Sequence, residues 1–565
     1  MSIRDVRSVD AVDRPIATKN LSGIGNFLGL YGGEHIAATE FVFGATLVSW
    51  GCSAKEIIIG LLLGNALAVL SFTLCTATMG SSTRLTLYSY LKKILGPWAQ
   101  KFYALVWGVC SIVLASSGVC VSATAIREVV GVPIQREWYP THIGFVAIVV
   151  VLGIVITLIA ANGFDAVSKF SSCCVPWMII AFFIGAVVAL PVLSNLTGAP
   201  IGSFKDIWNV FSSNVGITAN PDATPITWVH VMCFAWLCNL AWHMGLNDMG
   251  LFRYAKNAKY GFVTAIGMYV GHFFAWIMVA VMGAAASAVL QVALPELDPG
   301  AVTNTVFGLT GIAAVVIAGF TTANPTVYRS ALSLNIMFPK MSQKKLTYII
   351  GILMTILACF PAMTDIGDIV SILGWAVVGV GAIVLAEHFV FPKIGYTRHW
   401  AMYKGLKINW AACITWAISI VFVVAMKMTG ALHHNFIFIP EYIIAFVLYI
   451  ILAGLMGAKG DYSKEEAEEL KFEEDLQKYV DEEAEKEFES ANANKVHKGR
   501  MVEKVFPIIS YVILALIVVI ALMNFFGSMD LEAFKIWAFV LTLIYFGFAG
   551  TAKFVEFKNE AVTRD

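Results

Sequence analysis

The amino-acid sequence predicts an all-α membrane protein with about 14 transmembrane helices. Of its 565 residues, 58% are apolar and only 13% are Asp, Glu, Lys or Arg, whereas soluble domains average about 45–50% apolar and about 25% charged residues. The apolar residues fall in blocks of about 20 or more, the length at which an α-helix crosses about 30 Å of hydrocarbon. Lys and Arg recur in every second loop between these blocks, which is the alternation expected of a multi-pass protein.

Each apolar block is interpreted as one span. Residues 1–23 are polar and form an N-terminal tail, twelve blocks precede residue 458, and two more follow a charged stretch. The predicted spans are 24–50, 55–79, 98–129, 141–162, 168–193, 227–250, 260–290, 302–325, 344–361, 366–391, 408–428, 438–457, 504–526 and 534–553.

The loop charges predict the orientation. If the N-terminal tail is cytoplasmic, every second loop should be basic, and the loops expected outside carry acids such as Glu296 and Asp298 instead. We therefore expect a protein of the cell inner (plasma) membrane with both termini cytoplasmic. The cations of the tail and of the inside loops are Arg4, Arg7, Arg14, Lys19, Arg84, Lys92, Lys93, Arg253, Lys256, Lys259, Arg329, Lys340, Lys344, Lys345, Lys393, Arg398, Lys404 and Lys407.

An acidic insert separates the last two spans from the rest. Residues 461–500 hold 14 acids and 7 Lys or Arg, and the run KEEAEELKFEEDLQKYVDEEAEKEFE is rich in helix formers. We expect 458–503 to be a cytoplasmic helical insert, either a solvated charged helix or a regulatory or partner-docking element. Two additional spans within 504–553 and a cytoplasmic tail, 554–565, complete the chain.

The charge balance and the motifs exclude two function classes. A formal net charge of zero leaves no basic surface for a nucleic-acid backbone, so no nucleic-acid partner is expected. The chain also lacks the paired-Asp, HExxH and Gly-flanked Ser motifs of membrane-embedded enzymes. We therefore expect neither enzymatic activity nor a bound cofactor.

Spans 1 and 6 carry the signature of interrupted helices. Span 1 reads NFLGLYGGEHIAATEFVFG and span 6 reads FAWLCNLAWHMGLNDMGLF, with glycines beside ionisable and amide side chains. An opened backbone at membrane depth is tolerated where it lines a cavity, and two such segments in corresponding places mark a transporter's binding site. Because an odd-numbered unit repeated in tandem inserts upside down, 24–391 is predicted to be a five-plus-five inverted repeat, with spans 11 and 12 in 392–457. The alternative is that the glycines only permit close helix packing.

Ionisable residues inside these spans are candidate functional groups. A carboxyl at the helix centre costs about 2.5–3.5 kcal/mol on insertion scales, so Glu34 and Glu40 are expected to face a polar cavity or partner. They would bond substrate donors or balance charge. Together with His35 and His243, they are also the candidates for carrying a coupling proton.

Span 8 contains a candidate cation site. Ala318, Thr321 and Thr322 share one helix face, and two hydroxyls with a backbone carbonyl offer the oxygen ligands that hard cations prefer. Alternatively, the hydroxyls bond the carbonyl three or four residues earlier. Pro325 is expected to break the helix just beyond the pair, freeing backbone groups for Asn324.

Aromatic and amide residues suggest a binding site for a planar polar ring. Trp107 in span 3, and Trp236 and Trp242 in span 6, lie mid-membrane, away from the interfaces where Trp concentrates. Stacking on an aromatic is worth roughly 1–3 kcal/mol per base, and the amides of Asn239 and Asn324 can match a base edge. Packing is the alternative role for each Trp.

The chain resembles the nucleobase:cation symporter family one, the cytosine- and hydantoin-permease group of the amino acid–polyamine–cation superfamily. The resemblance covers about residues 20–457. Besides Trp107, the motifs that carry it are FGATLVSWGCSAKEIIIGLLLGN in spans 1–2, GLFRYAKNAKYG after span 6, TTANPTVYRSALSLN in span 8, and FPKIGYTRHWAMYKGLKINWAACITW before span 11.

The resemblance implies a five-plus-five inverted repeat within twelve core helices, and alternating access around a midplane site. By the same resemblance, Trp107 stacks on a heterocyclic substrate and Trp236 or Trp242 supplies a second aromatic. It also implies a Na+ site between span 1 carbonyls, with Gly33 and Ile36 as candidates, and the span 8 residues Ala318, Thr321 and Thr322.

Three departures from the family pattern leave the substrate open. Asn324 and Pro325 stand where an acidic–amide pair is usual, Ser111 replaces an amide after Trp107, and spans 1 and 6 carry extra ionisable groups. We expect a secondary symporter that imports a small polar, nitrogen-containing, nucleobase-like compound, driven by Na+ or, second, H+. The alternatives are an amino acid or quaternary-amine carrier of the same fold, or a non-coupled channel or receptor.

Overall fold

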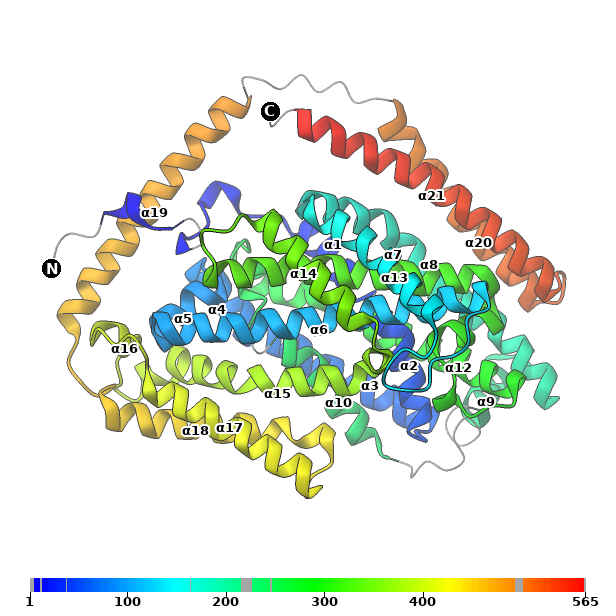
Figure 1. The fold of residues 1–565 in the computed structure, drawn as a ribbon, viewed down its shortest axis with the longest axis horizontal. Coiled ribbons are helices and arrows are strands. Elements are labelled where there is room, and N and C mark those ends of the chain that lie inside the picture. Colours follow the sequence, from blue (N-terminus) through cyan, green and yellow to red (C-terminus); the bar gives the residue numbers. More distant parts are fainter. Residues whose placement is uncertain are drawn as a thin grey trace.

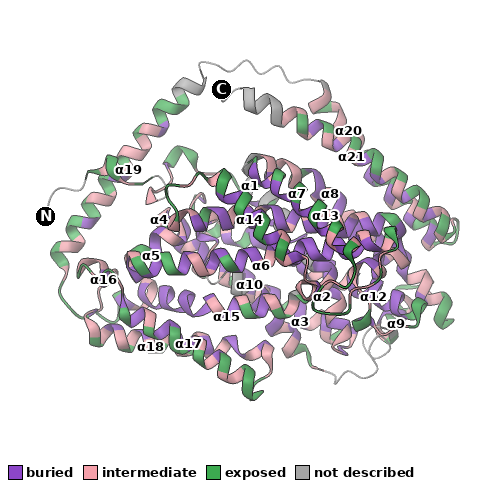
Figure 2. Ribbon diagram, viewed as in Figure 1, coloured by how far each residue is buried: buried purple, intermediate pink, exposed green. Residues whose placement is uncertain are grey.

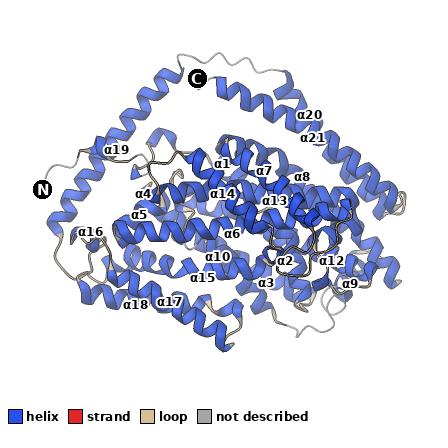
Figure 3. Cartoon of the chain, viewed as in Figure 1, coloured by secondary structure: helices blue, strands red, loops and turns tan. Residues whose placement is uncertain are grey.

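The chain folds into one large helical bundle. The computed structural model describes residues 5–10, 13–36, 38–162, 164–214, 226–243, 246–492 and 501–562, and within these ranges every regular element is a helix (Figure 3). Most helices run side by side, α19 lies across one end of the bundle, and the N-terminal segment lies beside it (Figure 1). The predicted all-α class is confirmed.

The helices follow the predicted spans in order. Three spans contain π-helical turns, which are inserted between or after α-helices as η4, η6 and η9. The elements that build the bundle are α1 (Ile24–Glu34), α2 (Ala38–Ser49), α3 (Ala54–Ser71), η4 (Phe72–Ala77), α4 (Thr78–Thr83), α5 (Leu87–Leu95), α6 (Pro97–Val130), α7 (Ile143–Ala161), α8 (Phe164–Thr197), α9 (Phe204–Asn214), α10 (Trp228–His243), α11 (Met249–Phe252), η5 (Ala258–Thr264), η6 (Gly267–Ala275), α12 (Trp276–Leu290), α13 (Pro299–Met337), α14 (Gln343–Ala358), α15 (Ile366–Leu385), η9 (Ala386–Val390), η10 (Phe391–Lys393), α16 (Trp400–Tyr403), α17 (Trp410–Thr429), α18 (Phe438–Met456), α19 (Ser463–Asn492), α20 (Met501–Phe525) and α21 (Leu531–Val562).

Eleven helical segments of the described chain are long and apolar enough to cross a membrane. Spans 1 and 6 are not among them because each is split into two shorter helices, and span 9 corresponds to the 16-residue helix α14. A multi-pass membrane fold is therefore established, while the count of 14 spans stays a prediction. Of the apolar stretch around α15, 78% is buried, against 28% for α17, α20 and α21, so α15 is central and the other three are peripheral (Figure 2).

Helices α6 and α13 form the closest pair at the centre of the bundle. A Cβ on Gly319 would lie 2.5 Å from the carbonyl oxygen of Gly118, and one on Gly300 would lie 2.4 Å from that of Thr124. Ser330 also donates a 2.9 Å hydrogen bond to the Gly108 carbonyl on the facing helix. Small residues and cross-helix hydroxyls hold membrane helices together in this way, and here they join span 3 to span 8.

The expected break after the two threonines of span 8 is wrong. Helix α13 continues through Pro325 to Met337, twelve residues past the predicted end, and its non-helical position is Gly308, with φ 61°. A proline is tolerated in a membrane helix when side chains and neighbouring helices satisfy the freed backbone groups. Here α6 packs against α13, and the turn around the proline also carries a 2.7 Å bond from the Thr326 hydroxyl to the Thr322 carbonyl.

Two of the four basic loops predicted to share one face lie together at one end of the bundle. Arg84, Lys92 and Lys93 of the loop after span 2, and Arg398 and Lys407 of the loop after span 10, line a single cavity beneath α19 and the N-terminal segment. At the loops expected on the other face, Arg136 pairs with Glu296 at 3.6 Å. The alternation of the remaining loops and the assignment of the basic end to the cytoplasm stay predictions.

Candidate substrate and cation site

Both predicted interruptions are present. In span 1, α1 ends at Glu34 and α2 begins at Ala38. In span 6, α10 ends at His243 and α11 begins at Met249, and Leu246 between them has φ 63°, a left-handed conformation that costs a branched residue energy. The backbone of each span therefore leaves the helical hydrogen-bonding pattern inside the bundle.

A buried hydrogen bond joins the two interrupted spans. The Tyr31 hydroxyl on α1 donates to Asp248 Oδ2 at 3.1 Å, although the residues are 217 positions apart. Phe252 of α11 stacks on the Tyr31 ring with centroids 5.6 Å apart. Both Tyr31 and Asp248 are buried, so this contact ties the last turn before one break to the start of the helix after the other.

The break in span 1 rests directly on η6 of span 7. A Cβ on Gly271 would lie 1.9 Å from the carbonyl oxygen of His35, and one on Gly267 would lie 2.8 Å from that of Tyr31. Side chains at either position would push the two segments apart. The two glycines therefore let η6 contact the opened backbone, and η6 is itself a π-helix, a form frequent at functional sites.

The carboxylate of Glu40 lies in a buried polar cluster that η6 and α12 complete. Trp276 Nε1 donates to Glu40 Oε2 at 2.8 Å, and His272 Nε2 lies 3.9 Å from Glu40 Oε1. The His272 ring stacks on Trp276 at 4.9 Å and meets the His35 ring edge-on at the same distance. Glu40 is 1% exposed, and a buried carboxyl needs such partners.

The sequence analysis did not name four residues of these two buried contacts as site residues. They are Tyr31, Asp248, His272 and Trp276. The available signal was GMYVGHFFAW, in which the helix-packing pattern Gly267-xxx-Gly271 precedes a histidine inside an apolar block. Hydropathy alone does not show which of several intramembrane polar groups face each other.

The tryptophans lie in different surroundings. Trp107 is buried in the same apolar cluster as Leu237 and Leu246 of span 6. Trp236 packs at the edge of that cluster, donates to the Ser71 hydroxyl at 3.1 Å and meets Phe438 edge-on. Asn324, on α13, is fully buried, and neither atom of its amide has a hydrogen-bond partner among the residues that the structure describes.

In span 8 the two threonine hydroxyls form the bonds of the alternative interpretation, to a carbonyl three or four residues earlier. The hydroxyls of Thr321 and Thr322 both donate to the Ala318 carbonyl, at 2.9 and 3.0 Å. These are the local bonds that membrane threonines commonly form, and they hold three oxygens close together. Ile36, at the break of span 1, lies in the same buried cluster as Ala318.

Part of the predicted site lies outside the described residues. This applies to the side chains of Glu34, Asn239, Trp242 and His243, and to the surroundings of Gly33. Among the residues that the structure does describe, no group of three or more His, Cys, Asp or Glu is placed to hold a metal ion.

Comparison with known proteins gives a clear result for the fold. No protein-family model and no curated protein matches the sequence. Among solved structures, Mhp1, a nucleobase-cation-symport-1 family transporter in a closed conformation with bromovinylhydantoin bound, matches 83% of this chain and 99% of its own, at a TM-score of 0.60 and 12% identity. The chain has the fold of a nucleobase-cation-symport-1 transporter. The resemblance predicted from the motifs is thereby confirmed at the level of the fold.

Two further structures agree. The inward-facing conformation of Mhp1 matches 81% of this chain and 97% of its own, at a TM-score of 0.60 and 14% identity. A Na+-coupled sialic acid symporter in a substrate-bound, outward-open state matches 76% of this chain and 89% of its own, at a TM-score of 0.55 and 15% identity. At these identities the likeness concerns the fold, and all of these neighbours are transporters.

Proposed function

We propose that this protein is a secondary active symporter that imports a small polar, nitrogen-containing compound, nucleobase-like in shape, by alternating access. The observation that carries the proposal is the pair of broken spans joined in the buried core by Tyr31 and Asp248. Broken helices in corresponding places supply free backbone groups to a ligand at the midplane. The fold shared with a nucleobase-cation transporter and a Na+-coupled symporter supports the same conclusion.

The substrate would lie between span 3, span 6 and span 8. In the proposed site Trp107 stacks on the ring, Trp236 or Trp242 covers its other face, and Asn239 and Asn324 bind its edge. The unbonded, buried amide of Asn324 supports this role, because leaving a buried polar group without a partner costs about 1–3 kcal/mol. Glu34 would bond substrate donors.

For the coupling ion, the first proposal is Na+. The ligands would be the Ala318 carbonyl, the hydroxyls of Thr321 and Thr322, and the carbonyls of Gly33 and Ile36. Support comes from the two span 8 hydroxyls, which lie 2.9 and 3.0 Å from the Ala318 carbonyl oxygen, and from the hard-cation preference for oxygen.

A proton is the second proposal, and one observation favours it. Glu40 and His272 form a buried carboxyl–imidazole pair, 3.9 Å apart, next to the break in span 1. Such a pair inside a membrane protein is a natural place to hold one proton. Here Glu40 takes the proton-carrying role, assisted by His272 and His35.

Uptake into proteoliposomes tests these proposals. The panel contains radiolabelled nucleobases, hydantoins, amino acids and quaternary amines, each measured with a Na+ gradient, a pH gradient or neither. Accumulation above equilibrium of a nucleobase-like compound is expected. Accumulation of only an amino acid or amine would favour the carrier alternative, and equilibration without accumulation would favour a channel.

Variants assign the coupling ion. Thr321→Ala and Thr322→Ala should raise the Na+ concentration needed for half-maximal uptake, while Glu40→Gln should abolish a pH-driven component. Unchanged Na+ dependence in both threonine variants would remove the proposed Na+ site.

The aromatic site has its own matched control. Trp107→Ala should abolish substrate binding, and Trp537→Ala on the exposed face of α21 should not. Equal loss of folded protein in Trp107→Ala would instead indicate that Trp107 has a packing role.

A further inference from the structure

The acidic helix α19 forms hydrogen bonds and an ion pair with the N-terminal segment, defined here as residues 13–23. The contacts come from side chains of α19 and from both backbone and side chains of the segment. They are Arg14 Nη1 to Glu483 Oε2 at 2.8 Å, the Thr18 N–H to Asp481 Oδ1 at 2.7 Å, the Thr18 hydroxyl to Asp481 Oδ2 at 3.2 Å, and Gln477 Nε2 to the Ile16 carbonyl at 3.2 Å.

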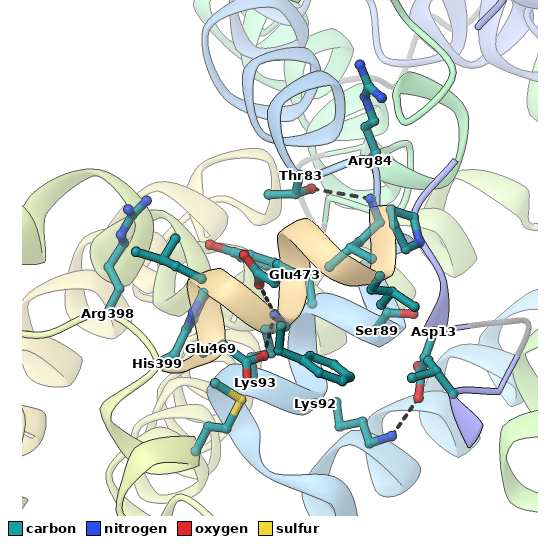
Figure 4. Close-up of a pocket in the computed structure, with 18 of the residues that line it drawn as sticks. Asp13, Thr83, Arg84, Ser89, Lys92, Lys93, Arg398, His399, Glu469 and Glu473 are labelled. Carbon is teal, nitrogen blue, oxygen red and sulfur yellow. Dashed lines mark hydrogen bonds and ion pairs between the residues drawn. The ribbon is translucent and has the colours of Figure 1, made fainter. Parts of the chain in front are cut away.

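The N-terminal half of α19 forms ion pairs with the bundle. Lys93 of α5 pairs with Glu469 at 3.1 Å and also with Glu473 (Figure 4). Its neighbour Lys92 pairs with Asp13 at 2.5 Å, which brings the N-terminal segment to the same helix. The segment, α19 and α5 thus form one closed set of contacts across this end of the bundle (Figure 1).

A cavity of about 1270 Å³ lies beneath these contacts. Its walls include Ser81 and Arg84 at the end of span 2, Tyr90 of α5 and His399 before α16, and its cover includes Asp13 and residues 466–477 of α19. The N-terminal segment and α19 therefore cover a cavity at this end of the bundle, rather than packing tightly onto the helices below.

The contacts are of a kind that can release. Of the described residues of α19, Glu469, Leu476 and Ala484 alone are buried, so little apolar area holds the helix in place. Arg14 and Glu483 are 25% and 42% exposed, and exposed ion pairs are individually weak and screened by salt. The Lys93–Glu469 pair, at 15% and 8% exposed, is largely buried, so the half of α19 that binds the N-terminal segment is the half that releases more readily.

The N-terminal segment is continuous with a helix of the proposed transport site. It leads directly into α1, which begins at Ile24, and α1 ends at the break beside His35. We propose that α19 is a latch: it holds the N-terminal segment and α1 over this end of the core, and its release permits the proposed site to open towards this end. The proposal rests on the proposed transport function, because only a transporter needs that opening.

Crosslinking tests the latch directly. Thr18→Cys and Asp481→Cys are combined and joined with a short, reducible bis-thiosulfonate reagent. The crosslinked protein should lose most of its uptake, because the rate follows the fraction of molecules that can open, and a reductant should restore it. The two variants that carry only Thr18→Cys or only Asp481→Cys beside the ten native cysteines, treated alike, are the controls. Failure to crosslink, or full uptake by the crosslinked protein, would overturn the proposal.

Weakening the latch should have the opposite effect. Asp481→Asn combined with Glu483→Gln should raise the initial uptake rate about two- to fivefold at low salt, and high salt should remove the difference. Glu485→Gln, an exposed acid on the same helix, is the matched control. Equal rates in the double variant and the control at low salt would contradict the latch.

A measurement without transport separates this proposal from the proposed function. Ser81→Cys lies in the cavity wall, and its labelling by an impermeant thiol reagent reports opening. Labelling should quicken in the Asp481→Asn, Glu483→Gln background relative to the Glu485→Gln background. Unchanged labelling overturns the latch, whereas quickened labelling in a protein that transports nothing overturns only the symporter.

Discussion

Gly271→Ala is the sharpest probe of how span 1 meets span 7. The added Cβ would lie 1.9 Å from the His35 carbonyl oxygen and 2.8 Å from its carbon. Both atoms belong to the backbone, so no side-chain rotation relieves the clash. To reach even a tight contact of about 3 Å, η6 and the end of α1 must separate by about 1 Å.

The magnitude follows from what this separation breaks. Overpacking by one methyl costs about 1–3 kcal/mol. Moving η6 by about 1 Å also stretches the 2.8 Å bond from Trp276 to Glu40 beyond hydrogen-bonding range, and a bond to a charged group is worth about 1.5–3 kcal/mol. The gain in helix propensity from Gly to Ala is only about 1 kcal/mol. The clash therefore prevails, with a net destabilisation of about 2–4 kcal/mol.

Thermal unfolding in detergent and uptake in proteoliposomes measure the effect. Gly271→Ala should unfold at a lower temperature and lose uptake, because the site around Glu40 is displaced. The matched control is Gly547→Ala on α21, where a Cβ meets nothing within 4 Å and stability should be unchanged or slightly raised. Identical behaviour of the two variants would refute the contact between η6 and the break in span 1.

Three further outcomes are expected. Arg127→Met should lower the free energy of unfolding by about 3 kcal/mol, because it leaves Asp298 of a mostly buried pair without its partner. Arg136→Met, which removes an exposed pair, should lower it by at most about 1 kcal/mol. Equal losses would contradict the burial argument. Burial, followed by the neighbouring imidazoles, lowers the pKa of His433 from 6.5 to about 4, so the unfolded chain binds the proton first and stability falls as the pH drops from 6.5 to 4. The loss should be about 1 kcal/mol after solvent screening of this partly exposed ring. Melting curves recorded at several pH values should show this loss in the wild-type protein and not in His433→Asn. Asn324→Leu should leave stability unchanged or raise it by about 1 kcal/mol yet abolish substrate binding; retained binding would remove Asn324 from the site.

Local chemistry explains why the interruptions could be predicted. Glycines beside Glu34 and Asn247 make a continuous, lipid-facing helix unfavourable. Because these residues are neighbours in the sequence, the interruption can be recognised without the structure. The same reasoning failed at Pro325, where the helix continues to Met337 with the facing helix α6 packed against it. A proline's effect depends on its neighbours in space, which the sequence does not display.

The polar partners in the core could not be predicted for a related reason. His272 reads as one histidine in an apolar block, and only the rotation of span 7 about its axis turns it towards Glu40. The acidic insert was recognisable as a helix from its composition. Its contacts with Thr18 and Lys93 could not be predicted, because an acidic surface can bind many different cationic groups or can simply face solvent.

The sequence by itself determined that this protein lies in a lipid bilayer, in which order its spans follow one another, and that spans 1 and 6 are interrupted. Each of these follows from the composition of a single stretch, since lipid requires every stretch to satisfy its own backbone. Only the tertiary structure decided that Tyr31 meets Asp248, 217 residues away, and that Lys93 meets Glu469, 376 residues away. Such pairs depend on how far each helix is rotated and tilted against its neighbours, and those angles are set by the packing of the whole bundle.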